Sequence, residues 1–313
     1  MNPFSVLYGA VSGARNALYQ RGVFRARRLR GAVVSIGNIA AGGSGKTPFV
    51  IMLGELLKKQ GIPFDILSRG YGRRTKGVLQ VSASGSAADF GDEPLLMAKR
   101  LNVPVIVGEN RFAAGTFAEK HFGPQLHLLD DGFQHRSLHR DFDIVLVSSD
   151  DAKDKLLPTG RLREPWSALD RADAIVLTNE SPGTVPLPKN KLIWRVTRSL
   201  ELANVPPRPI AFCGIARPQR FMDQLRDAGV TPVAKFFFDD HHSYTREDIQ
   251  KLEQLQQKHT SGGFITTEKD AMNLGDLALT LGTIVVARVT IELEDPSQAL
   301  DLLQRITSQS RQP

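Results

Sequence analysis

A glycine-rich segment between an apolar run and a helix-like run constrains this chain more than any other feature. It comprises Ala40, Ala41, Gly42, Gly43, Ser44, Gly45, Lys46 and Thr47. Residues 32–36 before it are strand-like, and residues 48–60 after it are helix-like. Glycines let backbone N–H groups turn inward around phosphate oxygens, and the N-terminus of the following helix attracts negative charge. The pattern predicts a phosphate-binding loop in which Lys46 contacts nucleotide phosphates and Thr47 ligates Mg²⁺.

Two departures from the usual phosphate-loop pattern narrow the class of site. Ala40 stands where the first glycine is usual, so a glycine-rich turn without nucleotide is the alternative. Ala41 replaces the lysine that marks dimeric ATPase switches, which counts against that class. Residues 267–270, Thr-Glu-Lys-Asp, lack the spacing of a guanine-specific motif. Adenine is therefore the expected base, and ATP the expected cofactor.

Short apolar runs alternate with helix-like runs along the first part of the chain. The apolar runs lie at residues 32–36, 63–67, 103–107, 126–129, 144–147 and 174–177, and the helix-like runs at 48–60, 93–101 and 111–122. Parallel strands are buried on both faces and are joined through helices. The alternation therefore predicts an α/β fold of the P-loop NTPase type, with a mostly parallel sheet.

Two proline-rich stretches mark a boundary in the chain. They lie at residues 181–190 and 205–209, and a second α/β pattern begins after them. We therefore expect a core domain over residues 31–204 and a smaller α/β domain over residues 205–313. The residues after about 291 carry no motif that we can place.

The first 30 residues hold most of the net positive charge. The chain has a formal net charge of +7, and residues 1–30 contain six arginines and no acid. Phe4, Leu7 and Val11 recur there at helical spacing. Three interpretations are open: an organellar transit peptide, a helix that covers the body of the protein, and an amphipathic helix that contacts anionic lipid at a membrane surface. No nucleic-acid partner is expected.

Cysteine content and hydropathy exclude two classes of protein. The single cysteine, Cys213, excludes an internal disulfide framework and a cysteine-rich zinc site. No apolar run reaches the roughly 18 residues expected of a transmembrane helix. His135 and His139 have a zinc-like spacing, but no cysteine or further histidine nearby completes a set. We expect an intracellular globular protein, either soluble or attached to a membrane surface.

An apolar run that ends in two carboxylates forms the second part of the expected nucleotide site. Residues 126–129 are followed directly by Asp130 and Asp131. In P-loop proteins such a strand ends beside the phosphate loop, and its acid contacts Mg²⁺ directly or through water. We assign Asp130 to the metal and Asp131 to the hydroxyl that accepts the phosphoryl group. The alternative is an ordinary turn at Asp131-Gly132.

An ordered set of motifs resembles a known family. The motifs lie at residues 35–48, 68–72, 91–94, 129–135, 160–165, 238–244 and 266–270. In this order they resemble tetraacyldisaccharide 4'-kinase, the lipid A 4'-kinase of Gram-negative bacteria. The resemblance extends from the leader to about residue 275, and the ordered set is more specific than the phosphate loop alone.

The resemblance implies transfer of the γ-phosphate of ATP to the 4'-hydroxyl of a tetraacylated glucosamine disaccharide 1-phosphate, in lipid A biosynthesis. It implies a peripheral protein at the cytoplasmic face of the inner membrane, whose N-terminal helix contacts that membrane. It also pairs Asp131 with a histidine that maps onto His241, although His242 is adjacent. The alternative function is a membrane-surface P-loop ATPase switch that acts on a protein partner.

The shared motifs place further residues at the site. Arg69, Asn38 and Gln134 are expected to bind substrate. Asp92 opens a helix-like run, where an acid can be an ordinary cap. The resemblance places Asp92 at the nucleotide and the metal instead.

A motif at residues 160–165 supplies two arginines and an acid. We expect Arg163, in preference to Arg161, to neutralise charge on the transferring phosphoryl group. Glu164 is expected to serve Mg²⁺. The role of His241 requires the C-terminal domain to close over the phosphate loop, with the proline-rich links as the hinge.

Overall fold

One continuous sheet organises the protein, which we describe from a computed structural model covering residues 3–43, 45–178 and 185–309. The strands are β1 (Val33–Asn38), β2 (Phe64–Ser68), β3 (Leu79–Gln80), β4 (Val105–Val107), β5 (Leu126–Asp130), β6 (Phe142–Val147), β7 (Ala174–Thr178), β8 (Leu192–Glu201), β9 (Ile210–Cys213), β10 (Ala234–Phe237), β11 (Phe264–Thr267) and β12 (Ile284–Leu293). Over the described residues, these 12 strands follow the order β10-β9-β11-β12-β8-β7-β6-β1-β5-β2-β4-β3.

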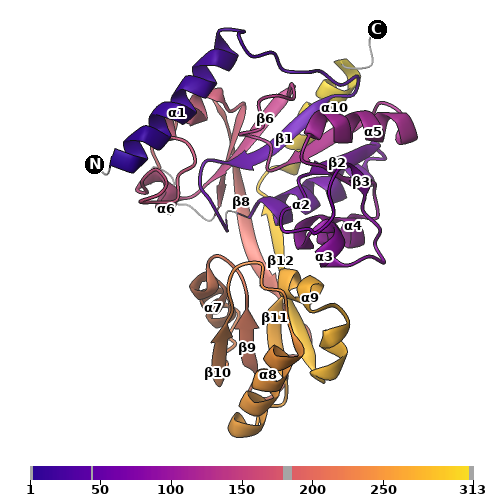
Figure 1. The fold of residues 1–313 in the computed structure, drawn as a ribbon, viewed down its shortest axis with the longest axis vertical. Helices are drawn as coiled ribbons and strands as arrows, with labels where there is room; N and C mark the ends of the chain where they lie inside the picture. The colour runs from indigo at the N-terminus through magenta and orange to yellow at the C-terminus, as the bar shows by residue number, and fades with distance from the viewer. Residues whose placement is uncertain (1–2, 44, 179–184, 310–313) are drawn as a thin grey trace.

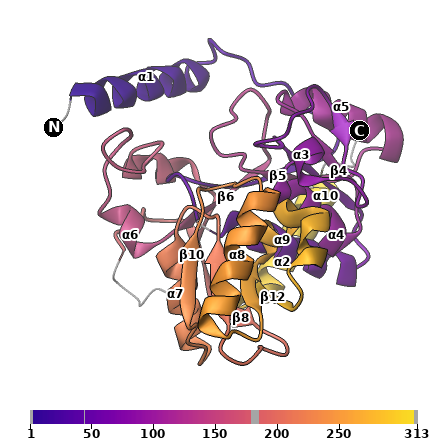
Figure 2. The same cartoon turned by 60° about the horizontal axis from the view of Figure 1, so that its bottom comes forward.

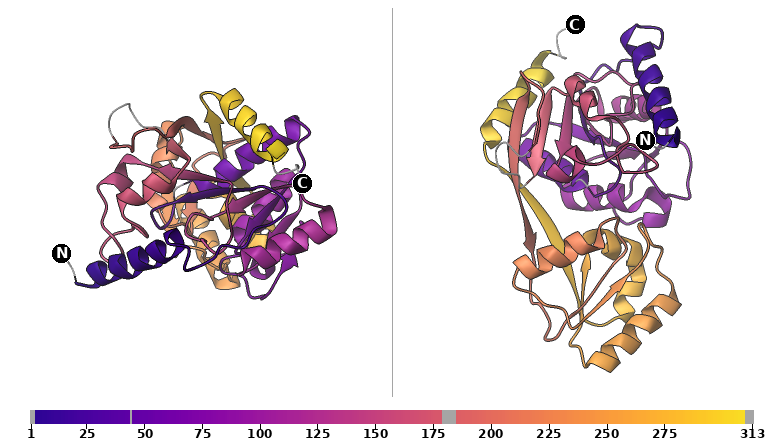
Figure 3. Two further views of the ribbon diagram at one scale, coloured as in Figure 1. Left: turned by 90° about the horizontal axis from the view of Figure 1, so that it is seen from above. Right: turned by 90° about the vertical axis from the view of Figure 1, so that its left-hand side faces the viewer.

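Helices pack on both faces of this sheet (Figures 1 and 3). The α-helices are α1 (Pro3–Gln20), α2 (Lys46–Lys59), α3 (Ala87–Phe90), α4 (Asp92–Leu101), α5 (Arg111–Phe122), α6 (Ser149–Ala152), α7 (Pro218–Asp227), α8 (Arg246–His259), α9 (Glu268–Leu274) and α10 (Pro296–Gln309). Two 3-10 helices, η1 (Trp166–Arg171) and η2 (Gly275–Thr280), complete the described elements.

The larger part of the molecule, which we call the core lobe, consists of β1 to β7 with α1 to α6, η1 and α10. Its central strand β1 pairs in parallel with β5 and β6, so that Ser35 lies opposite Leu129 and Asp143. All six residues of β1 are buried, as expected for a parallel strand covered on both faces. The prediction of an α/β fold with a mostly parallel sheet is confirmed.

The smaller part, which we call the C-terminal lobe, consists of β9 to β11 with α7 to α9 and η2. The long strands β8 and β12 join the two lobes as an antiparallel pair (Figure 1). β8 is parallel to its core neighbour β7, and β12 is parallel to its C-terminal neighbour β11. The strands of the two lobes therefore run in opposite senses, and their carboxyl ends face one another.

The last helix packs with the core lobe. Ala299 and Leu303 of α10 are fully buried in the same apolar cluster as Phe49 of α2 and Val34 of β1. Figure 1 shows α10 at the end of the molecule farthest from the C-terminal lobe. The expected second domain, residues 205–313, needs correction here, because α10 buries its apolar face against α2 rather than within the C-terminal lobe.

Helix α1 lies along the outside of the core lobe (Figure 2). The Ser5 hydroxyl lies on its inner face and donates to the Leu156 carbonyl at 3.1 Å. Phe4, Leu7 and Val11 of the same helix are 68%, 62% and 62% exposed. Of the helices described here, none is both long enough and apolar enough to cross a membrane.

Candidate functional site

A cleft with a volume of about 830 Å³ lies between the two lobes. Loops that follow β1, β2 and β5 line it on the core side, and loops that follow β9, β10 and β11 line it on the other. Ligands of α/β proteins bind at the carboxyl ends of parallel strands, in cavities of this size. The predicted site residues that line it are Gly42, Gly43, Gly45, Lys46, Thr47, Arg69, Asp92, Asp130, Asp131, Gln134, Arg163, Glu164 and His241.

The predicted phosphate loop joins β1 to α2. Gly42, Gly43 and Gly45 have φ values of 72°, 59° and 84°, in the left-handed region that glycine adopts without strain. Gly45 is also the N-cap of α2, so the unpaired amides of that helix open at the loop. Thr47 is buried in the first turn of α2. This backbone suits the binding of phosphate oxygens.

The two alanines of the loop attach it to a neighbouring segment and do not line the cleft. Ala40 forms an antiparallel bridge with Leu162, and the Ala41 amide donates to the Arg161 carbonyl at 2.7 Å. The loop therefore starts from a fixed position. Ser44, which we also expected to bind nucleotide, lies outside the described residues.

The Asn38 side chain bonds to both ends of the phosphate loop. Its side-chain oxygen accepts a hydrogen bond from Lys46 Nζ at 3.2 Å, and its amide donates to the Ala40 carbonyl. The Gln134 side chain donates to the Asn38 carbonyl at 2.8 Å. Asn38 is fully buried, so these contacts replace the substrate contact that the sequence suggested.

Asp130 ends β5 inside the cleft. Ser68 Oγ donates to its Oδ2 at 2.9 Å, whereas its Oδ1 is buried with no hydrogen-bond partner among the described residues. Burial, together with the negative charges of Glu93 and Asp131, raises the pKa of Asp130 to about 7. A cation at Oδ1 would remove this penalty, which makes Asp130 suitable for metal binding.

Asp131 is surrounded by positive charge. It adopts φ of 50° at the turn after β5 and lies 3.3 Å from Lys46 Nζ. Arg163 donates to both of its oxygens, at 3.0 and 2.9 Å. Burial opposes its ionisation, but the charges of Lys46 and Arg163 outweigh it and lower the pKa of Asp131 to about 2. A carboxylate of this kind is a weak base.

His241 pairs with Asp92, which corrects the expected pairing with Asp131. His241 Nδ1 lies 2.9 Å from Asp92 Oδ2, across the two lobes. The hydrogen bond to Asp92 is the main reason that the pKa of His241 is raised. Burial opposes the ionisation of Asp92, but the contacts with His241 and Lys269 lower its pKa. Asp131 is not available as the partner, because it is held by cations on the core side.

The neighbouring histidine has a different partner. His242 Nε2 lies 2.9 Å from Asp248 Oδ2, and Asp248 also accepts from the Thr245 hydroxyl at the start of α8. All three residues belong to the C-terminal lobe. Of the two adjacent histidines, His241 therefore lines the cleft.

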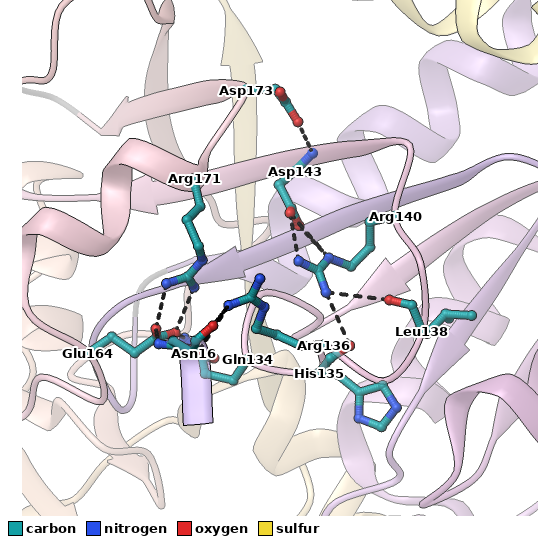
Figure 4. A network of polar contacts seen from close by, with 10 residues as sticks. All are labelled: Asn16, Gln134, His135, Arg136, Leu138, Arg140, Asp143, Glu164, Arg171 and Asp173. Carbon is teal, nitrogen blue, oxygen red and sulfur yellow. Dashed lines mark hydrogen bonds and ion pairs between the residues drawn. The ribbon is translucent and has the colours of Figure 1, made fainter. Parts of the chain in front are cut away.

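Glu164 does not fit the expected role at Mg²⁺. Arg171 donates to both of its oxygens, at 2.8 and 3.1 Å, and the side chains of Asn16 and Gln134 donate to it at 2.7 and 3.1 Å (Figure 4). The carboxylate is 2% exposed. Since both oxygens already accept hydrogen bonds from the protein, Glu164 is a structural junction in this arrangement.

Arg163, rather than Arg161, lines the cleft, as expected. Arg161 points to Asp154 and Asp151, at 2.7 and 3.6 Å. Arg163 reaches the cleft because its amide donates to the Ile39 carbonyl at 2.7 Å, beside the phosphate loop.

Several arginines gather around His135, and the sequence analysis identified only one of them. Burial and the charges of Arg111, Arg140, Arg15 and Arg69 lower the pKa of His135 to about 4. Arg69 was expected to bind substrate, and the other three were missed. Arg111 carried one signal, because it occupies the first turn of α5, where helices favour acids. Of these four, Arg15 and Arg69 line the cleft, where cations suit a phosphorylated ligand, whereas Arg140 is bound to Asp143.

The cleft fits Mg²⁺ only in combination with a ligand. Among the residues described, no three or more His, Cys, Asp or Glu side chains are grouped to hold a metal. Mg²⁺ in nucleotide sites takes one or two protein ligands together with phosphate oxygens and water. The unpartnered Oδ1 of Asp130 and the hydroxyl of Thr47 supply such a set.

Comparison with known proteins identifies the family. The sequence profile of the Tetraacyldisaccharide-1-P 4'-kinase family matches residues 1–307. The chain belongs to this family.

Individual relatives agree with this assignment. A Koribacter versatilis protein named tetraacyldisaccharide 4'-kinase is 49% identical over 98% of each chain. A Geobacter metallireducens protein of the same name is 37% identical over 93% of each chain. The crystal structure of LpxK from Aquifex aeolicus in complex with ATP superposes with a TM-score of 0.80, at 35% identity, over 97% of this chain and 98% of that one.

Family membership decides between the two expected functions. This chain is a kinase, and the predicted resemblance is confirmed along nearly its full length. The alternative, a P-loop switch acting on a protein partner, has no support in these comparisons.

Proposed function

We propose that this chain transfers the γ-phosphate of ATP to the 4'-hydroxyl of a tetraacylated glucosamine disaccharide 1-phosphate, a step in lipid A biosynthesis. The family supplies the reaction, and the solved relative binds ATP. The observation that carries the proposal in this chain is the His241–Asp92 pair, which faces the phosphate loop and Asp130 across one cleft.

The core lobe would hold the nucleotide. The loop amides around Gly42, Gly43 and Gly45 and the ammonium of Lys46 suit the phosphates. Thr47 and Asp130 would hold Mg²⁺, which neutralises phosphate charge when bound.

The C-terminal lobe would supply the base. An ionised Asp92 only accepts hydrogen bonds, so His241 Nδ1 carries a proton and Nε2 is left to accept one. In this proposal Nε2 takes the proton of the 4'-hydroxyl as its oxygen attacks the γ-phosphorus, and the bond from that phosphorus to the β–γ bridging oxygen breaks to release ADP. Asp92 fixes the tautomer and stabilises the imidazolium that forms.

Asp131 would act on the phosphate side rather than as the base. Its pKa of about 2 keeps it ionised, and its contacts hold Lys46 and Arg163 beside the phosphate loop. Arg15 and Arg69, which line the cleft, suit the 1-phosphate of the substrate.

Helix α1 would dock the enzyme on a membrane. Phe4, Leu7 and Val11 form an exposed apolar stripe, and Val23 and Phe24 are exposed in the turn that follows the helix. The arginines of the first 30 residues suit anionic head groups. A peripheral position at the cytoplasmic face of the inner membrane would bring the cleft to an acylated substrate.

Phosphate transfer from labelled ATP to a tetraacyldisaccharide 1-phosphate in detergent micelles tests the proposal. Wild type should label the lipid, and Lys46→Ala should not. Labelling by both proteins, or ATP hydrolysis without labelled lipid in wild type, would contradict the proposed acceptor and site.

A further inference from the structure

The inner face of α1 contacts two loops that border the cleft. Asn16 Nδ2 donates to Glu164 Oε2 at 2.7 Å. Arg136 donates to the main-chain oxygen of Asn16 at 3.0 Å and to its side-chain oxygen at 3.4 Å. One side chain of α1 therefore bridges the loop after β5 and the loop that contains residues 160–165 (Figure 4).

Glu164 connects Asn16 with residues beside the phosphate loop. It is covalently next to Arg163, whose guanidinium donates to Asp131 at 2.9 Å. Gln134 donates both to Glu164, at 3.1 Å, and to the main-chain carbonyl of Asn38. The side-chain oxygen of Asn38 in turn accepts from Lys46. A shift of Glu164 would displace groups on both sides of the phosphate loop.

The junction is buried, so its geometry depends on its partners. Glu164 is 2% exposed, and a hydrogen bond to a buried charge is stronger than one between neutral groups. Misplacement of a reacting group by about 1 Å costs on the order of a hundredfold in rate. The loss of one donor to Glu164 is therefore large enough to be measured in turnover.

We propose that Asn16 is a positioning residue: through Glu164 and Arg136 it sets the placement of Arg163 and Gln134, so that α1 supports phosphoryl transfer as well as membrane contact. The inference rests on the proposed function. It assigns different tasks to opposite faces of one helix. Phe4 and Leu7 lie on the exposed face, and Asn16 is partly buried on the inner one.

The test compares Asn16→Asp with wild type and with Gly13→Ala. Asn16→Asp keeps the shape and the oxygen that accepts from Arg136, but places a carboxylate where the donor to Glu164 was. Gly13 is exposed on α1, and a methyl group there meets nothing within 4 Å. Lipid phosphorylation is measured with the substrate in micelles and in anionic phospholipid vesicles, together with ATP affinity, vesicle binding and Tm.

We expect Tm of Asn16→Asp to fall, because a second carboxylate faces Glu164. At a temperature where the variant stays folded, kcat per folded molecule should fall about tenfold or more in both micelles and vesicles, with the Kd for ATP and vesicle binding close to wild type. Gly13→Ala should behave as wild type. Asn16→Ala should lose activity in the same direction, and Asn16→Gln, which keeps the amide, should recover part of it.

Three outcomes overturn the inference. They are an Asn16→Asp variant with full kcat, a loss confined to vesicles, which indicates membrane contact alone, and a loss that disappears when kcat is expressed per folded molecule, which indicates stability alone. Wild type that labels no lipid overturns the proposed function itself and is seen before any variant is compared.

Discussion

Two histidine–carboxylate pairs of similar geometry lie in different parts of the molecule. His127 Nδ1 lies 2.8 Å from Asp65 in the core lobe, and His241 Nδ1 lies 2.9 Å from Asp92 between the lobes. The His127 side chain is 0% exposed, whereas that of His241 is 23% exposed.

Their surroundings give the two pairs different chemistry. Burial opposes charge on His127, but Asp65 and Glu119 outweigh it and raise its pKa to about 9. His127 is therefore a fixed cation that binds two buried acids. His241 has one hydrogen-bonded carboxylate, Asp92, and it lines the cleft with its Nε2 3.9 Å from Asp240, so it can exchange a proton with a ligand. A histidine–carboxylate pair is therefore not a catalytic base by itself. Exposure to the cleft and the phosphate loop opposite distinguish His241 from His127.

The largest expected effect comes from removal of the exposed member. His241→Ala should lower kcat by about 10³-fold, within the range of general-base catalysis, while Tm and the Kd for ATP stay close to wild type. Steady-state phosphorylation and ATP titration measure both quantities. The control is His121→Ala, which removes an exposed histidine of α5 that does not line the cleft. Equal kcat values for the two variants would refute the role of His241.

Loss of the buried pair should lower stability and leave activity unchanged, the opposite of the result expected for His241. His127→Gln leaves Asp65 and Glu119 buried without their cation, so the free energy of unfolding should fall by about 3 kcal/mol or more. Activity per folded molecule should stay near that of wild type. Chemical denaturation with activity assays at low temperature measures this. A variant as stable as wild type would show that the core pair contributes no net stability.

The pH dependence of stability gives an independent view of His127. Its pKa in the folded protein, about 9, is above the ordinary 6.5, so its contribution is fully present below pH 6.5 and is lost as the pH rises through 9. Over this window, wild type should lose about 3 kcal/mol more than His127→Gln does. Parallel Tm curves for the two proteins from pH 6.5 to 10 would contradict the charge assignment.

The pH profile of turnover sharpens the comparison at His241. The base must be neutral, and Asp92 raises the pKa of His241, so kcat should rise with pH through a midpoint above 6.5. Asp92→Asn should move this midpoint down toward 6.5 and lower the plateau by about tenfold. Log kcat against pH for both proteins is the measurement. An unchanged midpoint would mean that the ionisation of another group limits kcat at low pH.

The smallest effect should come from the contact that joins the lobes beside this pair. Arg100 of α4 donates to Glu268 of α9 at 2.6 Å. Glu268→Gln should raise KM for ATP about threefold, because a partly exposed ion pair contributes up to about 1 kcal/mol. Asp223→Asn is the matched control, since it removes an exposed ion pair with Arg226 within α7. An unchanged KM would separate this contact from closure of the cleft.

Much of the fold was predictable from local sequence. The helix at 111–122 has the expected bounds, because apolar periodicity and caps are local signals. The pairing of β8 with β12 was not predictable, since it joins residues about 90 positions apart, such as Ser199 and Thr290. The packing of α10 against the core lobe depends on that pairing, because β12 leads the chain back to this lobe.

The site was predictable on the core side and only in part elsewhere. The phosphate loop and Asp130 are contiguous with strand ends, where the sequence pattern places them directly. The partner of His241 lies 149 residues away in the other lobe, and no spacing rule connects the two. The contacts of Glu164 could not be predicted, because Asn16 and Arg171 are brought to it only by the tertiary fold.

The return of α10 to the core lobe has a consequence for synthesis. Leu293, Ala299 and Leu303 complete the apolar cluster that contains Val34 and Phe49, although they emerge from the ribosome some 250 residues later. A nascent chain can assemble the intervening C-terminal lobe first, while α2 still exposes the surface that α10 will cover. The core lobe is synthesised first but completes its packing last. Until α10 has been made, the nascent chain exposes an apolar surface that chaperones can bind.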